Sequence, residues 1–266
     1  MESQLGVRLL HRTTRKVTVT ADGAAYYERC LRILDDLREA DDAVSSKDGD
    51  PSGRLRVDVF TSMASHLMAT GLPDFLARHP RIKLELGCSD RPINLVSEGV
   101  DCVIRAGEFS DSSLIARRVG SMRFVTCATQ AYLDQHGEPT HPDQLAAHRL
   151  INYILPTTGR PAPWDFTKDG ERLTLTQDGP LSLNDSNVHE DACLAGLGIA
   201  RMPSFAYERY QRCGALRAVL SDWTSDPVPL HVVYSSKRHL STKVQAFVEW
   251  TAEFCENSPG LRRAHG

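Results

Sequence analysis

Residues 4–20 read QLGVRLLHRTTRKVTVT, and this stretch decides how the rest of the chain is interpreted. A turn at Gly6 leads into an alternating run that contains basic side chains and a histidine: Arg8, His11, Arg12, Arg15 and Lys16. No acidic residue occurs between Glu2 and Asp22. A short hairpin with Arg and Lys at its tip suits a polyanion backbone, because these side chains neutralise phosphates. From charge alone, a solvated basic turn is the simpler interpretation.

The order of the residues is more specific than their charge. The stretch LGVRLLHRTTRKVTVTADG (5–23) resembles the wing that closes the winged helix-turn-helix of LysR-type transcriptional regulators. The resemblance continues to about residue 256 and so covers nearly the whole chain. It implies that the wing contacts double-stranded operator or promoter DNA. The implied contact residues are Arg8, Arg12, Thr13, Thr14, Arg15 and Lys16.

In this family, the helices that enter the major groove precede the wing. Here Met1–Gln4 would form only the last turn of the recognition helix, so residues 1–20 are interpreted as an incomplete winged helix-turn-helix. The leading hypothesis is a DNA-binding regulator of the LysR type. The alternative is a cytoplasmic ligand-binding dimer that does not bind specific DNA by itself. An enzyme built on a binding-protein fold is the third hypothesis.

Composition sets broad limits on these hypotheses. The 266 residues suffice for two or three compact units, and 41% hydrophobic with 24% charged residues is ordinary for a globular protein. A net charge of -3 argues against nonspecific nucleic-acid binding by the whole chain, so DNA affinity must come from a local patch. No run of about 18 apolar residues and no signal peptide occur, so we expect no membrane contact and a cytoplasmic location.

The chemistry-bearing residues do not form a recognisable catalytic or metal-binding motif. The seven cysteines include no CxxC pair, which favours scattered reduced thiols, although a redox pair such as Cys193 with Cys213 stays open. The sequence Asp185-Ser186-Asn187-Val188-His189 lacks the context of a catalytic triad, and the G-x-G at Gly196–Gly198 follows a predicted helix rather than a strand. We therefore expect no catalytic residue, no metal and no cofactor.

A long amphipathic helix follows the wing. Thr20 is a good N-cap, and residues 21–47 are predicted to be helical. Apolar residues recur there at alternating spacings of four and three, which is the seam of a coiled coil: Tyr26, Cys30, Ile33, Leu37, Ala40 and Val44. The helix could instead pack on its own domain. A hinge-like stretch, 48–53, follows it. The resemblance implies a homodimer through this helix and leaves open whether dimers pair into homotetramers.

From Arg54 the pattern changes to strands that alternate with helices. Strands are predicted near 55–60, 82–86 and 101–105, with helices near 93–97 and from Ser62 or Ser65 to Pro80. This β-α-β-α-β order predicts a parallel sheet with right-handed crossovers. Later elements are expected at 123–128, 173–176, 181–183, 188–195, 230–234 and 241–255.

The fold class is therefore α/β, and the resemblance implies the two-lobed effector domain of the LysR family, which is similar to periplasmic binding proteins. It places lobe I at 54–125 and 230–256 and lobe II at 126–229. The tail, 257–266, lacks any pattern and is expected to be disordered.

A small-molecule effector is expected between the lobes. In open α/β sheets, ligands bind beyond the carboxyl ends of the strands, where helix N-termini offer free N–H groups. This rule and the family's cleft select four loops, whose candidate residues are Thr61, Ser62, Ser65, Asp90, Arg91, Arg105, Asn184 and Asp185. Arg105 and Arg91 would favour an anionic effector. Plain N-capping by the Ser and Asp residues is the alternative, and Arg105 could equally pair with Asp90 or Glu108.

Overall fold

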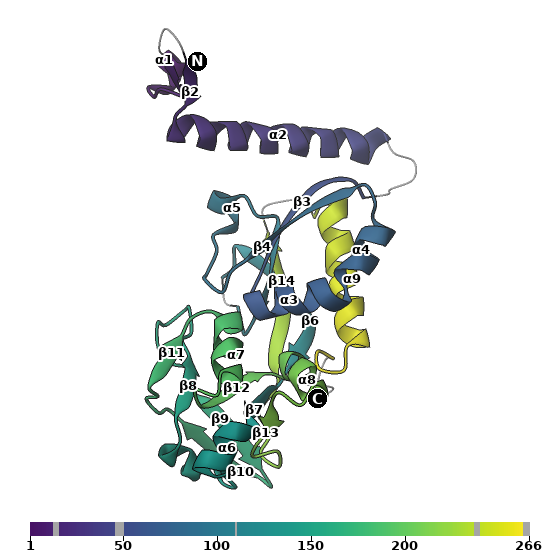
Figure 1. Ribbon diagram of the computed structural model, residues 1–266. Coiled ribbons are helices and arrows are strands. Elements are labelled where there is room, and N and C mark those ends of the chain that lie inside the picture. Colours follow the sequence, from purple (N-terminus) through teal and green to yellow (C-terminus); the bar gives the residue numbers. More distant parts are fainter. Residues whose placement is uncertain (13–15, 46–50, 110, 237–239, 263–266) are drawn as a thin grey trace.

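The computed structural model describes residues 1–12, 16–45, 51–109, 111–236 and 240–262. A small N-terminal unit and one long helix lie across one end of the molecule, next to the first of two α/β lobes that follow each other along its length (Figure 1). The two-lobed α/β architecture predicted from the sequence is confirmed.

Lobe I contains a five-stranded mixed sheet in the order β4-β3-β5-β14-β6. Its strands are β3 (Gly53–Val59), β4 (Ile82–Cys88), β5 (Cys102–Ala106), β6 (Leu114–Met122) and β14 (Val228–Ser235). β3 pairs in parallel with β4 and β5, which confirms the predicted parallel arrangement. β14 lies between β5 and β6 and is antiparallel to both, so the chain completes lobe I after it has built lobe II.

Helices cover both faces of the lobe I sheet. On one face lie α3 (Thr61–Thr70), α4 (Leu72–Arg78) and α9 (Thr242–Asn257), and α5 (Leu95–Glu98) packs on the other. The prediction of one helix capped by Ser62 or Ser65 is wrong. α3 begins at Thr61, and the helix breaks at Gly71, where an added Cβ would lie 2.7 Å from the Phe254 ring.

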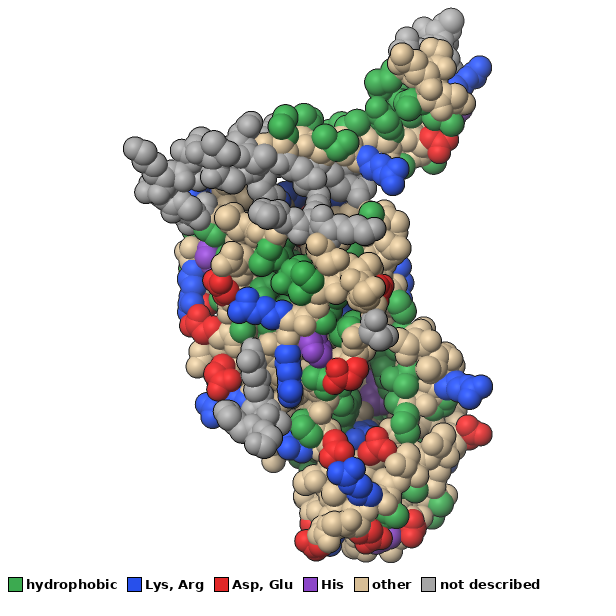
Figure 2. All heavy atoms as spheres, turned by 180° about the vertical axis from the view of Figure 1, so that it is seen from behind, with side chains coloured by type: hydrophobic (Ala, Val, Ile, Leu, Met, Phe, Trp, Pro, Cys, Tyr) green, Lys and Arg blue, Asp and Glu red, His purple; other side chains and the backbone are tan. Residues whose placement is uncertain are grey.

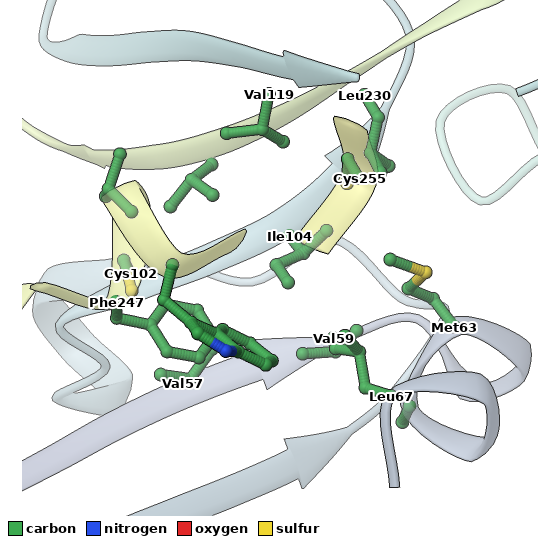
Figure 3. Packing of buried hydrophobic residues seen from close by; sticks show 14 of the residues in the cluster. Val57, Val59, Met63, Leu67, Cys102, Ile104, Val119, Leu230, Phe247 and Cys255 are labelled. Atoms are coloured by element: carbon green, nitrogen blue, oxygen red, sulfur yellow. The ribbon is translucent and has the colours of Figure 1, made fainter. Parts of the chain in front are cut away.

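The core of lobe I is built from the predicted alternating strands. Figure 3 shows Val57 and Val59 of β3 packing with Ile104 of β5 and Phe247 of α9. Leu261 is completely buried in this core, and its backbone oxygen accepts a hydrogen bond from the Ser121 N–H. The expectation that the tail is disordered is therefore wrong up to residue 262, and residues 263–266 lie outside the described part.

Lobe II contains a second five-stranded sheet, in the order β11-β8-β12-β7-β13. The strands are β7 (Phe124–Ala128), β8 (Leu150–Tyr153), β11 (Leu181–Leu183), β12 (Ile199–Pro203) and β13 (Arg217–Ala218). The helices are α6 (Gln130–His136), the 3-10 helix η1 (Pro142–Ala147), α7 (Ser186–Leu194) and α8 (Ser204–Arg212), and β9 (Trp164–Lys168) pairs with β10 (Glu171–Leu175) as a hairpin. The G-x-G stretch is a helix-to-strand turn, as predicted, with Gly196 in the left-handed region.

The chain crosses between the lobes twice, and the two crossings are fastened together. Arg123, between β6 and β7, donates from Nη1 to the backbone oxygen of Ser225 over 2.7 Å. The buried hydroxyl of Ser225 accepts from the Phe124 N–H over 3.2 Å. The two crossings therefore lie side by side where the lobes are connected. A further connection is the packing of Phe205 and Ala206 of α8 in the lobe I core.

The N-terminal unit consists of α1 (Glu2–Leu5), the hairpin of β1 (Leu10–Arg12) and β2 (Val17–Val19), and the long helix α2 (Ala21–Ser45). Glu2 ties the start of α1 to the hairpin, because its Oε1 accepts from the backbone N–H groups of Leu9 and Leu10 over 2.7 and 2.9 Å. Thr20 caps α2 as predicted, accepting from the Gly23 N–H over 2.9 Å. The hairpin tip, with Thr13, Thr14 and Arg15, lies outside the described residues.

Gly23 sets the approach of the hairpin to α2. A Cβ at this position would lie 2.0 Å from the backbone oxygen of Leu9. Helix propensity alone predicts that Gly23→Ala stabilises by about 1 kcal/mol. The clash of the added Cβ with Leu9 predicts destabilisation instead. Hydrogen exchange at the Leu9 and Leu10 amides should therefore accelerate about tenfold or more.

Ala25→Gly is the matched control, because Ala25 is exposed on the same turn of α2. It should weaken the helix by about 1 kcal/mol without accelerating exchange in the hairpin. Native protection of the Leu9 and Leu10 amides in Gly23→Ala would contradict the close approach.

Candidate functional site at the inter-lobe contact

The N-termini of two helices, one from each lobe, meet where the lobes touch. α3 of lobe I begins at Thr61 and α7 of lobe II begins at Ser186. The hydroxyl oxygens of these two residues are 2.8 Å apart. The first N–H groups of a helix have no partner within it and carry partial positive charge. Two such ends at one point make a strong site for an anion.

The carboxylate of Asp90 lies between the two helix ends. Its Oδ1 accepts from the Thr61 N–H over 2.7 Å, and its Oδ2 accepts from the Ser186 N–H over 2.5 Å. Asp90 follows β4 by two residues and is 9% exposed. One side chain of lobe I thus satisfies the first N–H of a helix in each lobe.

Further polar contacts join the same two helices. The Ser62 N–H donates to the Ser186 hydroxyl over 2.9 Å, and the Asn187 side-chain amide donates to the Ser65 hydroxyl over 3.0 Å. Asp185 caps α7, because its Oδ1 accepts from the N–H groups of Asn187 and Val188, each over 2.9 Å. The N-capping interpretation therefore holds for Asp185, and Asp90 has a role in both helices.

Arg105 does not point a free charge at this site. Its Nη2 donates to Asp58 Oδ1 over 2.5 Å, and both side chains are largely buried. Pairing with Asp90 or Glu108, as the sequence suggested, is therefore wrong. Burial raises the pKa of Asp58 above its usual value, and the guanidinium of Arg105 only partly offsets this. Gly87 provides the space, since a Cβ there would lie 2.5 Å from Asp58 Oδ2.

Two other predicted residues lie at the margin. The exposed Arg91 forms an ion pair with Glu98 over 2.5 Å, so its charge is also compensated. Asn184 is exposed, one residue before the cap of α7. The structure therefore brings Thr61, Ser62, Ser65, Asp90 and Asp185 together. It does not direct the two arginines at the helix ends.

Several residues near this contact were not among the candidates named from the sequence: Asp58, Tyr153 and Glu190, together with Ser186 and Asn187, which lay in a selected loop. Tyr153 ends β8, and burial, assisted by the charges of Asp90 and Asp185, raises the pKa of its hydroxyl. Asp58 could have been identified from the sequence, because an acid within an apolar strand needs a charged or hydrogen-bonding partner. For Ser186 and Asn187, the sequence indicated only that they lie where a helix is capped.

Glu190 of α7 is a second buried acid at the contact. Tyr210 donates to its Oε2 over 2.9 Å, and the buried Ser62 hydroxyl lies close enough to the carboxyl to lower its pKa. Burial raises the pKa of Glu190 to about 7, although the hydrogen bond from Tyr210 and the charge of Arg209 lower it. The hydroxyl of Ser62 therefore lies beside Glu190.

Other candidate motifs are accounted for by structure. His189 is buried and contacts the backbone oxygen of Ile151 over 3.0 Å, so it does not join Asp185 and Ser186 as a triad. Cys193 donates to the backbone oxygen of Cys127, and Cys213 is exposed, so the suggested redox pair is not formed. Within the described residues, no group of three potential metal ligands comes together. A groove of about 460 Å³ beside Arg78 and Trp250 lies on lobe I, apart from the helix ends.

Comparison with known proteins supports one family. Residues 48–256 match the model of the LysR substrate binding domain. The chain is 36% identical over 262 residues to an HTH-type transcriptional repressor of Pseudomonas aeruginosa, covering 98% of this chain and 83% of that one. It is 31% identical over 270 residues to the HTH-type transcriptional activator AaeR of Escherichia coli, covering 100% and 86%.

Solved structures agree with this assignment. CrgA of Neisseria meningitidis, a LysR-type transcriptional regulator, superposes with a TM-score of 0.68 at 32% identity, covering 95% of this chain and 85% of that one. The virulence activator AphB of Vibrio cholerae gives a TM-score of 0.65 at 31% identity, covering 95% and 86%. The chain belongs to the LysR family of transcriptional regulators. Among its described residues, no helix is both long enough and apolar enough to cross a membrane.

The raised pKa of Glu190 predicts a pH-dependent stability. The unfolded chain releases this proton near pH 4.5 and the folded chain near pH 7, so the folded state holds more protons in between. Its contribution to the free energy of unfolding therefore falls as pH rises through that window, by on the order of 3 kcal/mol. The free energy of unfolding of Glu190→Gln, measured with denaturant, should not fall in this way. The stability of the variant relative to the parent should therefore increase as pH rises.

Glu256→Gln serves as the control, since Glu256 is exposed at the end of α9. Its difference from the parent should stay constant over the same pH range. Parallel stability curves for Glu190→Gln and the parent would show that Glu190 does not titrate there.

Proposed function

We propose that this regulator binds DNA as a homodimer and responds to a small anionic effector at the inter-lobe contact. The observation that carries the effector proposal is the meeting of two helix N-termini, α3 and α7, at one carboxylate position. Because Arg105 and Arg91 are already paired with acids, the anion preference is attributed to the helix ends and their hydroxyls. Thr61, Ser65 and Asp185 would orient the effector from the two lobes.

The effector would act by changing how the lobes are held. The described hydrogen bonds that join α3 to α7 are polar contacts for which a ligand can compete. The lobes are also joined by the two crossings at Arg123 and Ser225 and by Phe205 of α8, which packs in the lobe I core. A ligand can shift an arrangement only by binding its alternatives with different affinity. A site to which both lobes contribute residues binds a ligand with different affinity in the closed and open arrangements, because opening the lobes separates its two halves.

The wing is proposed to contact the DNA backbone. Arg8 and Lys16 are exposed on the α1–hairpin unit, which Glu2 and Thr20 hold against the start of α2. The side chain of Arg12 and residues 13–15 lie outside the described part and remain predicted contacts. The repressor and activator roles named for the two relatives above support a DNA-binding role.

The long helix α2 is proposed to dimerise the chain. Four of its large apolar side chains are exposed: Tyr27, Ile33, Leu34 and Leu37. Hydrophobic side chains lie along the described part of this helix in Figure 2. Ile33 and Leu37 belong to the predicted seam, and the side chains of Ala40 and Val44 lie outside the described residues. Burial against a second α2 would remove this apolar surface from water.

The DNA proposal is tested by retention of the chain's own upstream intergenic DNA against unrelated DNA of equal length. We expect specific retention. Arg8→Ala with Lys16→Ala should weaken it and reduce the slope of log affinity against log salt by about 2, because two phosphate contacts are lost. Lys83→Ala, an exposed charge on β4, is the control and should leave the slope unchanged. Equal retention of both DNAs by the parent would refute specific binding.

The dimer proposal is tested by sedimentation of Ile33→Glu with Leu37→Glu. Two charges in the seam should raise the dimer dissociation constant at least 100-fold, since each replaces a buried apolar contact with a desolvated acid. Val96→Glu is matched, because Val96 is 71% exposed on the separate helix α5. If the double variant sediments as the parent does, α2 is not the dimer contact.

A further inference from the structure

The Asp90 side chain supplies the hydrogen-bond acceptor for the two helix N-termini at the inter-lobe site. Its carboxylate accepts the first N–H of α3 and the first N–H of α7, one on each oxygen. The Thr61 hydroxyl lies 3.3 and 3.4 Å from the same two oxygens. Because Asp90 is 9% exposed, little of this contact is shared with bulk water.

The position between the two helix ends is suited to binding a carboxylate. Phe60 precedes α3 and cannot cap it with its side chain, so Asp90 supplies the oxygen that the Thr61 N–H needs. At α7, Asp185 accepts from the second and third N–H groups and leaves the first, that of Ser186, to Asp90. A free carboxylate could make the same two hydrogen bonds.

We propose that Asp90 is a built-in carboxylate that occupies the anion position and holds the two lobes together until the carboxylate of an effector displaces it. This inference rests on the proposed effector function. It assigns the effector class, a carboxylic acid, and makes Asp90 its intramolecular competitor rather than its ligand.

Displacement has a structural consequence within lobe I. Asp90 lies in the loop that leaves β4, and the backbone oxygen of the next residue, Arg91, accepts from Arg105 Nη2 over 3.3 Å. An effector carboxylate would satisfy both helix ends but would not be joined to this loop. The loop would then be released from α7, although the helix ends stay filled. The position of residues 89–92 therefore reports which carboxylate is bound.

The direct test is chemical rescue of Asp90→Ala by sodium formate, with sodium chloride at equal concentration as the reference. Removing the carboxylate should lower the thermal midpoint by about 2–8 °C, because two buried N–H groups lose their partner. Formate should then bind with a dissociation constant on the order of 20 mM, so that 200 mM raises the midpoint by about 2–6 °C beyond chloride. The parent should show no such difference.

Three variants define the site of rescue. Asp111→Ala removes an exposed carboxylate that accepts from the Ser113 N–H. Formate should not raise the thermal midpoint of this variant beyond the effect of chloride. Asp90→Ala with Ser186→Pro lacks one of the two N–H groups and should lose the formate effect. Asp90→Ala with Ser186→Ala keeps that N–H and should retain it. A folded Asp90→Ala that responds to formate no more than to chloride overturns the proposal.

A second comparison applies if Asp90→Ala does not fold. Ser186 is the first residue of α7, where proline is tolerated, and the extended backbone of Asp185 (φ -122, ψ 126) suits a residue before proline. With Asp90 intact, Ser186→Pro should melt about 2–4 °C below Ser186→Ala, since proline removes the N–H that donates to Asp90. Equal midpoints overturn the proposal. Failure of specific DNA retention by the parent would instead refute the proposed function and leave the formate result unaffected.

Discussion

Two helix N-termini with one carboxylate between them are the constraint on which the inter-lobe arrangement depends. The first N–H groups of α3 and α7 cannot be satisfied within their helices, and the contact between the lobes removes most water that could serve them. Asp90 meets both needs at once, with hydrogen bonds of 2.7 and 2.5 Å. The neighbouring contacts of Ser62, Ser65 and Asn187 then align the two helices around it.

The chain order explains why this contact can both form and open. Lobe I is interrupted after β6 and resumes at β14, so lobe II is inserted between two strands that are neighbours in one sheet. The two crossings are fastened to each other at Arg123 and Ser225. The helix ends of α3 and α7 form a polar contact that a ligand can compete for, and beside it Phe205 and Ala206 of α8 pack into the lobe I core.

The parts of this account that were predictable from sequence follow from short-range patterns. Alternation at Leu55, Val57 and Val59 predicted β3. The rule that ligands bind beyond the carboxyl ends of parallel strands selected Thr61 and Asp90, which are neighbours, and the family resemblance added Asp185. The capping role of Thr20 needed only its position before a long amphipathic run.

What could not be predicted depends on partners that are distant in the sequence. The ion pair of Arg105 with Asp58 is fixed by the pairing of β3 with β5, which a single sequence does not specify. The buried face of α7 includes Glu190 because Tyr210 of α8 reaches it, and Leu261 is buried because it packs beneath β6. β6 was not predicted, because its first half, which includes Arg117 and Arg118, is exposed and shows no alternation of apolar and polar residues.

The central claim is that one carboxylate holds both helix ends at the same time, and amide hydrogen exchange at Thr61 and Ser186 tests it most directly. These two amides, from different lobes, should be protected to a similar degree in the parent, because both open only when Asp90 leaves. A carboxylate that displaces Asp90 should change both exchange rates together. Strong protection of one amide with free exchange of the other would contradict the claim.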